Sequence, residues 1–393
     1  TSYSVGDVVR NSGNVYEAIQ AGTSAGSGGP TNEGDSIVDN SVTWKFINDG
    51  GIAHGNATIT GVTSTTVVDA TVNRAFASHA ADTHWSLGAY SGTTGYPRAV
   101  AFFEQRLFFA GSKEQPQTIW GSKSGDFETH TPSALDDGAI NVTIATDQVN
   151  AIRWLSPGTV VAIGTAGGEF TLSSSSDQEA ITPTNIRVVR QGTRGSFATR
   201  PIRIDNRVIF IQNQRRKLRE IVFELSTNSF VSPDLTILAE NISGAGFVEM
   251  TFQQEPDSVI WLVRDALIGL TFQKDQEVIG WHLHQIGGTG AVVESVTSIS
   301  GDGYDEVWMT VRRTINSVTR RYVEVLQSKF DTARGDAKTD AFFVDSGLTY
   351  SGTATATLSG LDHLEGQTVS ILGNGAVYPN QTVTGGQVTG LSP

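Results

Sequence analysis

The sequence predicts an all-β protein: a β-propeller-like array of about five four-stranded repeats, with a small β-domain at each end. One observation is a strand–turn–strand–loop–strand unit that recurs about every 50 residues, the spacing of propeller-type repeats. Its middle strands begin near Leu107, Val160, Val208, Val259 and Val307. These strands (VVAIG, VIFIQ, VIWLV) are almost uninterrupted apolar runs, as expected for strands covered on both faces. Turn residues at every junction and no helical period complete the pattern.

The first repeat shows the unit most clearly. Strands are predicted over Ala99–Phe103, Arg106–Ala110 and Thr118–Trp120, with a tight turn at Glu104–Gln105. Four further units span residues 151–172, 201–223, 248–272 and 295–325. A fourth strand is expected between units, at Ile140–Ala145, Asn185–Val189, Leu235–Leu238 and Gly280–His284. Each sheet has two apolar faces and must stack on its neighbours, so we assign residues 96–335 to one array.

The array is flanked by smaller β segments. Residues 1–50 form a module with strands predicted at Asp7–Arg10, Val15–Ala18 and Val42–Phe46. Residues 51–95 are a β-rich connector, with strands expected at Ala57–Gly61 and Thr65–Val68. Residues 336–393 form a C-terminal β domain with strands expected at Thr353–Leu358, Thr368–Leu372 and Gln381–Val383. The chain opens without Met and ends within a strand pattern, so we expect a fragment or a processed piece.

Composition limits the function classes. The chain has 393 residues, only 17% of them charged, and a formal net charge of −13. Binding to nucleic acid gains free energy when Lys and Arg neutralise phosphates, so this charge argues against a protein that grips DNA as a whole. The absence of cysteine excludes disulfides and thiolate metal sites.

No catalytic centre, metal site or cofactor is predicted. The candidate carboxylates fall mostly in turns, and none pairs convincingly with a second acid as a glycosidase requires; they are Asp136, Asp137, Glu169, Asp205, Asp257 and Asp305. His54, His79 and His84 lack a chelating spacing, and we interpret them as solvated loop residues. His282 and His284 alternate along one strand and share a face. This permits a metal pair, although a partly buried or pocket-facing pair without metal is the favoured interpretation.

One predicted hairpin tip is strongly basic. The segment NQRRKLRE places Arg215, Arg216, Lys217 and Arg219 close together. Such a tip can contact an acidic neighbouring subunit or partner, or the phosphates of a nucleic acid, or it can simply be a solvated turn. We take subunit or partner contact as the functional candidate.

The N-terminal module resembles the small chitin-binding-type carbohydrate modules appended to hydrolases and phage tail proteins. The resemblance lies in Tyr3, Gly6–Val9, Val15–Ala18 and Thr43–Trp44. In that family exposed aromatic rings stack on sugars, which implies a carbohydrate-binding role for Tyr16 and Trp44. The alternative is that both rings form the core of a very small sheet, since a domain of this size needs its aromatic residues for burial.

Two further stretches resemble the tail nozzle protein (tail tubular protein B) family of short-tailed phages and prophages. They are residues 84–128 and 342–383, and the matching positions are Gly95–Pro97, Gln105–Gly111, Trp120–Phe127 and Leu361–Gly366. The resemblance implies a non-enzymatic virion protein: a homohexamer at the distal end of the tail that docks on an adaptor ring and contacts tail fibre or spike proteins. Genomic DNA would pass through its lumen without sequence-specific binding.

The alternative function is a surface-binding adhesin that holds a host polysaccharide through the N-terminal module. A propeller glycosidase is a third, more distant hypothesis.

Overall fold

The computed structural model describes residues 1–32, 34–48, 55–74, 76, 87–132, 135–146, 149–176, 179–226, 228–288, 290–338, 341 and 344–392. It confirms an all-β, propeller-like fold. The chain divides into two compact units, Thr1–Ala89 and Tyr90–Pro393, each considered by itself. Within the described residues, no helix has the length and apolarity needed to cross a membrane.

The first unit holds a four-stranded antiparallel sheet in the order β2–β3–β6–β5. Its strands are β2 (Val8–Asn11), β3 (Asn14–Gln20), β5 (Ile37–Asp39) and β6 (Val42–Asn48), beside the short pair β1 (Ser2–Tyr3) and β4 (Gly22–Thr23). A separate hairpin follows, made of β7 (Asn56–Ser64) and β8 (Val67–Arg74). The three strands predicted in the module and the first connector strand are present. The second connector strand begins later than predicted, at Val67.

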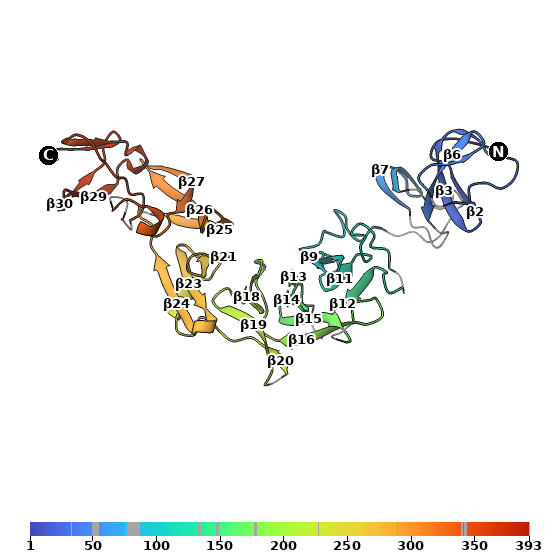
Figure 1. Ribbon diagram of the computed structural model, residues 1–393, viewed down its shortest axis with the longest axis horizontal. Coiled ribbons are helices and arrows are strands. Elements are labelled where there is room, and N and C mark those ends of the chain that lie inside the picture. The colour runs from blue at the N-terminus through green and yellow to red at the C-terminus, as the bar shows by residue number, and fades with distance from the viewer. Residues whose placement is uncertain are drawn as a thin grey trace. The chain divides into compact units, whose positions relative to one another are not determined.

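The second unit contains the repeats as five successive antiparallel sheets, which follow one another in chain order (Figure 1). The first sheet comprises β9 (Ala99–Phe103), β10 (Arg106–Ala110), β11 (Thr118–Gly121) and β12 (Ile140–Thr143). The second comprises β13 (Ile152–Ser156), β14 (Val161–Thr165), β15 (Gly168–Ser174) and β16 (Ile186–Gly192). The third comprises β17 (Ile202–Ile204), β18 (Arg207–Ile211), β19 (Leu218–Glu224) and β20 (Ser229–Val231).

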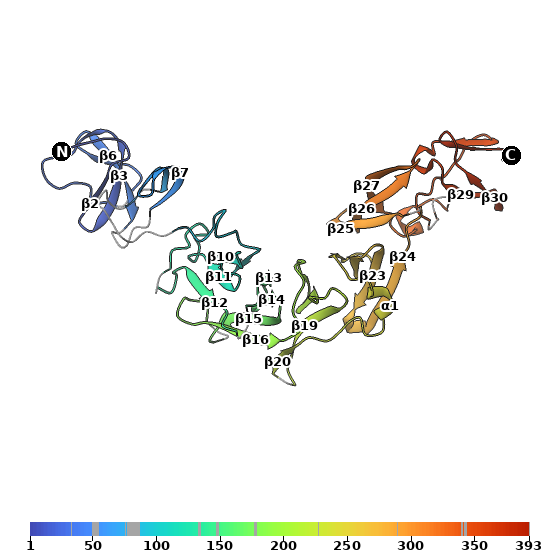
Figure 2. The same ribbon diagram turned by 180° about the vertical axis from the view of Figure 1, so that it is seen from behind.

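The fourth sheet comprises β21 (Glu249–Gln253), β22 (Val259–Val263), β23 (Leu267–Gln273) and β24 (Val278–His284). The one-turn helix α1 (Glu240–Ser243) precedes it and is labelled in Figure 2. The fifth sheet comprises β25 (Val292–Ser300), β26 (Asp305–Ile315) and β27 (Val318–Leu326). It has three strands in the described chain, so the prediction of four strands in every repeat is wrong there.

Strand alternation explains why the middle strands are apolar throughout. Successive side chains of a strand point to opposite faces, so a strand covered on both faces needs apolar residues at every position. Ile209 and Ile211 of β18 pack in the cluster shared with the fourth sheet, whereas Val208 and Phe210 pack in the cluster shared with the second. Similar clusters join the first sheet to the second and the fourth to the fifth. The core is therefore distributed between consecutive sheets.

The predicted turn of the first repeat is confirmed by its backbone. Glu104 and Gln105 both have positive φ, 45° and 58°. Positive φ at both central residues matches the twist of a two-residue hairpin. The turn sets the register, in which Arg106 pairs with Phe103 and Ala110 with Ala99.

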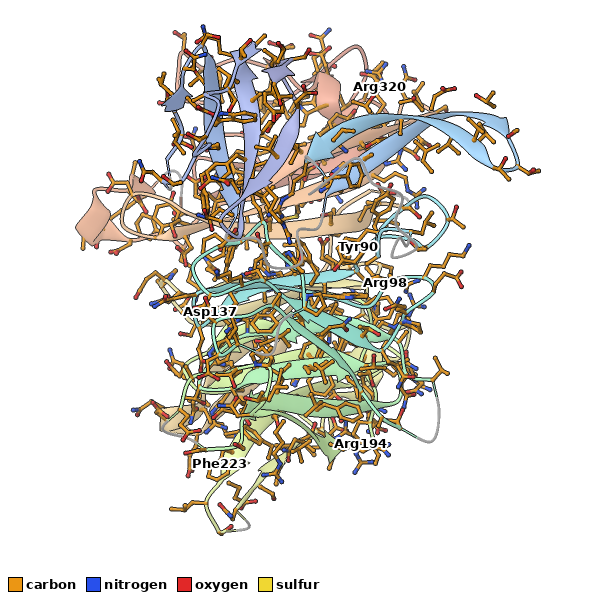
Figure 3. The ribbon with its side chains drawn as sticks, turned by 90° about the vertical axis from the view of Figure 1, so that its right-hand side faces the viewer. Tyr90, Arg98, Asp137, Arg194, Phe223 and Arg320 are labelled. Carbon is orange, nitrogen blue, oxygen red and sulfur yellow. The ribbon has the colours of Figure 1, made fainter. Side chains whose placement is uncertain are left out.

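The fourth strand of the third repeat is misplaced in the prediction. It forms at Ser229–Val231, where Val231 pairs with Val222 and Phe230 packs edge-on against Phe223. Phe223 is labelled in Figure 3. The predicted segment, Leu235–Leu238, is a turn. The Asp234 carboxylate accepts hydrogen bonds from the Thr236 amide (2.9 Å) and hydroxyl, which bends the chain there.

The C-terminal segment consists of two small antiparallel pairs. They are β28 (Thr357–Ser359) with β31 (Gln387–Thr389), and β29 (Thr368–Gly373) with β30 (Ala376–Thr382). Val383, Val388 and Leu391 form their shared core. Upstream of these pairs, Asp345 accepts bidentate hydrogen bonds from Arg313 of β26 (2.8 and 2.9 Å). This ion pair connects the C-terminal segment to the fifth sheet.

Candidate partner-contact site at the β18–β19 hairpin

The basic segment predicted from the sequence is the connection between β18 and β19. Its backbone closes through hydrogen bonds from the Gln212 amide to the Lys217 carbonyl (2.9 Å) and from the Arg215 amide to the Gln212 carbonyl (2.7 Å). Arg215 has a positive φ of 64°, which turns the chain at the tip. Arg215 and Arg216 at the tip are therefore exposed, whereas Lys217 lies closer to the sheet.

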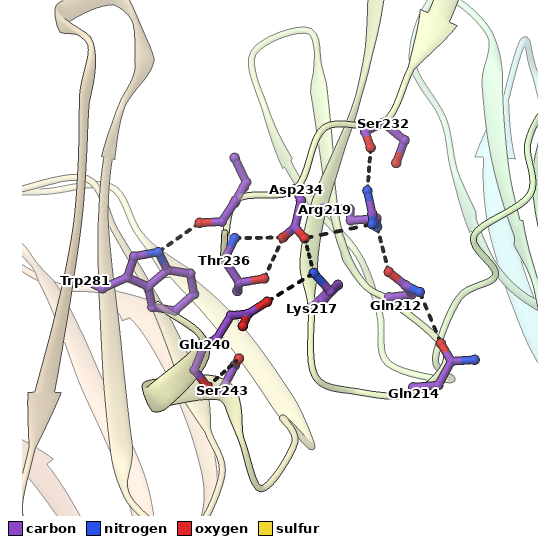
Figure 4. A network of polar contacts seen from close by, with 11 residues as sticks. Gln212, Gln214, Lys217, Arg219, Ser232, Asp234, Thr236, Glu240, Ser243 and Trp281 are labelled. Carbon is purple, nitrogen blue, oxygen red and sulfur yellow. Dashed lines mark hydrogen bonds and ion pairs between the residues drawn. The ribbon is translucent and has the colours of Figure 1, made fainter. Parts of the chain in front are cut away.

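Lys217 is held by carboxylates from a segment downstream. Its ammonium lies 2.6 Å from Asp234 and 3.7 Å from Glu240 (Figure 4). Burial by itself would raise the pKa of Asp234. The hydrogen bonds from Lys217 and Thr236 outweigh this effect and hold that pKa below its ordinary value. Asp234 is thus an ionised acceptor at neutral pH, and Lys217 is largely neutralised within the chain.

Arg219 is buried rather than presented. Its guanidinium donates to the Gln212 side chain (2.6 Å) and the Ser232 carbonyl (2.8 Å), and lies 3.9 Å from Asp234. Burial lowers the pKa of Arg219, and Asp234 opposes that effect. A buried cation with these partners fixes the hairpin against the segment after β20. Arg219 is therefore a structural residue, and its burial argues against the partner contact predicted for it.

Arg215 and Arg216 are the members of the basic set that face solvent. The Arg215 guanidinium lies over the Phe197 ring, 5.6 Å from its centroid, a cation–π arrangement. Arg216 is exposed and lines a shallow depression of about 440 Å³. The depression is bordered by Gln212, Gln214, Arg216, Lys217, Glu240 and Ser243.

The surface left at the tip has mixed charge. Glu240 retains 71% of its side-chain exposure beside the two outward arginines. Such a surface suits reciprocal ion pairing with another protein chain better than a phosphate backbone, which selects a run of uncompensated cations. Of the four predicted residues, the structure thus leaves Arg215 and Arg216 available for subunit or partner contact.

The carbohydrate role predicted for Tyr16 and Trp44 does not fit the structure. Tyr16 is 0% and Trp44 1% exposed, and both belong to the core of the first module. Trp44 packs edge-on against Tyr3, and its indole N–H donates to Asp39 (3.2 Å). Neither ring offers a face to a sugar, because this small sheet uses its largest side chains as its core.

Three of the carboxylates considered in the sequence, those of Asp137, Asp257 and Asp305, have structural partners. Asp257 pairs with Lys329 (2.6 Å), and Asp305 accepts from the Gln254 and Glu255 amides. The Asp137 carboxylate pairs with Lys123 (3.3 Å), whereas the contact of Asp136 with Arg106 is made by its main-chain carbonyl. Asp205 has a positive φ in the turn between β17 and β18.

Glu169 is the buried member of this set of acids. It is 1% exposed, and burial raises its pKa, although the Arg194 and Gly195 amides oppose the shift. One carboxylate oxygen accepts from the Arg194 amide (3.3 Å), and the other has no hydrogen-bond partner in the described chain. Among the described residues, no group of three side chains that could hold a metal ion occurs at this site.

His282 and His284 form a direct contact on β24. Their ring nitrogens Nδ1 and Nε2 lie 2.7 Å apart, and both rings pack edge-on against Trp261. Burial lowers the pKa of both imidazoles. The other histidines considered, His54, His79 and His84, lie outside the described residues.

Comparison with known proteins does not assign this chain to a family. No family model matches the sequence, and no curated protein matches it. Among solved structures, a luciferin-regenerating enzyme aligns over 53% of this chain and 80% of its own, with 12% identity and a TM-score of 0.24. This similarity is too low to indicate either fold or function.

Proposed function

We propose that this protein is a structural component of a short-tailed phage particle, the nozzle through which DNA leaves the capsid, assembled as a homohexamer at the distal end of the tail. The observation that carries the proposal is the array of five sheets whose cores are continuous from each sheet to the next. Such an array is suited to a rigid wall. Within this array, the residues that carry the resemblance to the nozzle family have structural roles.

Arg106 illustrates this role. It is 2% exposed and donates to the carbonyls of Ser122 (2.7 Å), Asp136 (2.8 Å), Asp137 (3.3 Å) and Gly138. One side chain thus organises the loop between β11 and β12, which includes much of the motif at residues 120–127. Unpaired buried carbonyls are costly, so this loop depends on Arg106.

The motif glycines are similarly architectural. A Cβ on Gly121 would lie 2.7 Å from the Phe108 ring, and one on Gly95, where φ is 82°, would lie 2.8 Å from the Lys113 amide nitrogen. The motif therefore preserves close packing around the first sheet. Close packing of this kind supports the proposal that the sheets form a rigid wall.

The charge of the chain is compatible with a DNA conduit. Six copies of a chain with net charge −13 form a strongly acidic assembly, which repels the duplex and favours sliding over retention. A closed ring of identical subunits is the usual symmetric solution for such an assembly. We assign contact with a neighbouring subunit, the adaptor ring, or a tail fibre or spike to the tip that bears Arg215 and Arg216.

The adhesin alternative depended on exposed rings at Tyr16 and Trp44, and both side chains are buried. No other described feature favours binding of a host glycan.

Native mass measurement of the full chain, together with the adaptor protein of the same particle, tests the proposal. We expect a complex with six copies of this chain. A stable adaptor complex with any other copy number would contradict the homohexameric nozzle.

A further inference from the structure

His282 and His284 form a pair whose geometry the proposed function does not use. They are alternate residues of β24, the outer strand of the fourth sheet, and both rings lie on the same face. His282 Nδ1 and His284 Nε2 are 2.7 Å apart, and the ring centroids are 4.9 Å apart at an interplanar angle of 72°. Two ring nitrogens therefore converge on one point.

That convergence matches the requirement for chelation. With metal–imidazole bonds of about 2.0–2.1 Å, two ligand nitrogens lie roughly 3.3 Å apart at the tetrahedral angle of zinc and roughly 2.9 Å apart at the right angle of a square-planar Ni²⁺ or Cu²⁺ site. The observed separation is 0.2 Å shorter than the right-angle value. In the metal-free pair, one nitrogen must donate a proton to the lone pair of the other. A cation replaces that proton once both rings rotate so that each lone pair points at it.

The neighbouring strand is shaped to admit the His282 ring. His282 lies opposite Gly269 of β23, and a Cβ at position 269 would lie only 1.9 Å from His282 Cε1. Any larger residue at 269 would displace the ring. Beyond Gly269, on β22, the Trp261 ring packs edge-on against both imidazoles, at 5.6 Å from His282 and 4.9 Å from His284.

The Thr271 hydroxyl contacts the His282 ring and orients it. His282 Nε2 lies 3.4 Å from the Thr271 hydroxyl, on the side of the ring away from His284. A hydrogen bond from Nε2–H to that hydroxyl leaves the Nδ1 lone pair free to bind a metal. Histidine ligands in metal sites commonly fix their second nitrogen in this way. Both imidazoles are half-buried, so a hydrated cation can reach them.

Imidazole pairs select borderline first-row cations. Zn²⁺, Ni²⁺ and Cu²⁺ prefer nitrogen ligands, whereas Mg²⁺ and Ca²⁺ prefer oxygen. The charged groups that act on His282 are Lys329 and Asp257, which oppose each other and form an ion pair 2.6 Å apart. The described chain provides no cluster of three ligands, so water completes the coordination shell.

We propose that His282 and His284 together bind one first-row divalent cation of the Zn²⁺, Ni²⁺ and Cu²⁺ class, with His282 Nδ1 and His284 Nε2 as its two protein ligands. The site bridges two positions on the outer strand of the fourth sheet and is independent of the basic hairpin tip.

Titration of the full-length chain, without a polyhistidine tag, with NiCl₂ in a calorimeter tests the proposal. Wild type is expected to bind one Ni²⁺ per chain, and the double variant H282N/H284N is expected not to bind it. Loss of a residue that only hydrogen-bonds to a metal ligand costs about 10–100-fold in metal affinity. Loss of a ligand itself should cost at least as much, so each single variant should bind Ni²⁺ at least about tenfold more weakly. The matched control is His363→Asn, an exposed histidine in another part of the second unit, which should leave this binding unchanged. MgCl₂ should produce no heat that depends on the pair.

A measurement on wild type alone covers the case in which a variant fails to fold. Bound Cu²⁺ should show, by electron paramagnetic resonance, coupling to two imidazole nitrogens. Coupling to a single nitrogen, or Ni²⁺ binding that survives in a folded H282N/H284N chain, overturns the proposal.

Discussion

Lys217 and Asp234 form an ion pair 2.6 Å long that joins the β18–β19 hairpin to the segment after β20. The same carboxylate holds the turn at Thr236 and lies near Arg219. Asp234 is thus the common acceptor of the network in Figure 4. The network determines which of the basic side chains remain available to a partner.

Replacing Asp234 with Asn should destabilise the second unit. The change leaves two cations without their acceptor, and we expect a loss of about 2 kcal/mol at pH 7 in urea unfolding. The folded-state pKa of Asp234 is depressed, so its contribution is present above the ordinary value of 3.8 and is lost as pH falls through the folded value. The difference between wild type and variant should therefore shrink below pH 4. Asp275→Asn, at an exposed acid, serves as control; equal stability of the two variants at pH 7 would exclude the network.

Reversing the charge at Arg216 should weaken assembly without changing the stability of the fold. Arg216 makes no ion pair within the described chain and is exposed, so Arg216→Glu is expected to leave the unfolding temperature within about 2 °C of wild type. It should nevertheless weaken association with the neighbouring subunit or the adaptor, measured by analytical ultracentrifugation. Arg320→Glu, an exposed arginine of the fifth sheet, is the matched control. Unchanged association for Arg216→Glu would remove the hairpin tip from the contact surface.

Glu169→Gln should stabilise the protein at neutral pH. Burial raises the pKa of Glu169, so the protonated form is favoured in the folded state. Its contribution therefore falls as pH rises from the ordinary value through the raised folded value. At pH 7 the amide avoids burying a charge, and we expect a gain of roughly 1 kcal/mol. The gain should vanish near pH 4, and a loss of stability at pH 7 would show that the ionised carboxylate is needed.

Arg106→Met should be among the most damaging single changes in the array. It removes the donor for four carbonyls in a buried position, and we expect a loss of about 3 kcal/mol in chemical denaturation. Hydrogen exchange should increase first in residues 122–132. The exposed Arg98 on the same unit provides the control substitution, Arg98→Met. If both variants were equally stable, the motif would have to serve another purpose.

Trp44→Ala should unfold or loosen the first module. The side chain is 1% exposed, and truncation of a buried tryptophan costs about 3–5 kcal/mol. Hydrogen exchange of β3 and β6 reports the change directly, with Val38→Ala as an exposed control. A variant that keeps its protection but loses binding to chitin would restore the carbohydrate role.

The sequence predicts the sheets because their signal is local. Apolar runs such as Val259–Val263 require two covered faces, and the turn at Glu104–Gln105 is enclosed by strands that pair in register. The segment Leu235–Leu238 looked equally strand-like, but the side chain of Asp234 stabilises a turn there. A side-chain hydrogen bond of that kind is not visible in a hydrophobic pattern.

The candidate site depended on information that a linear pattern does not contain. Lys217 and Arg219 appear as free cations until Asp234, distant in sequence, is brought beside them. Aromatic residues spaced as Tyr16 and Trp44 suit a sugar platform and a small core equally well, and only burial distinguishes the two. The shared face of His282 and His284 followed from strand alternation, whereas their 2.7 Å contact required the structure.

The most direct test of the central claim is electron cryomicroscopy of a short-tailed particle that contains this chain. The proposed function predicts six copies around the tail axis at its distal end, with the stacked sheets forming the wall of a channel. Density for this chain away from that axis, or in a copy number other than six, would contradict it.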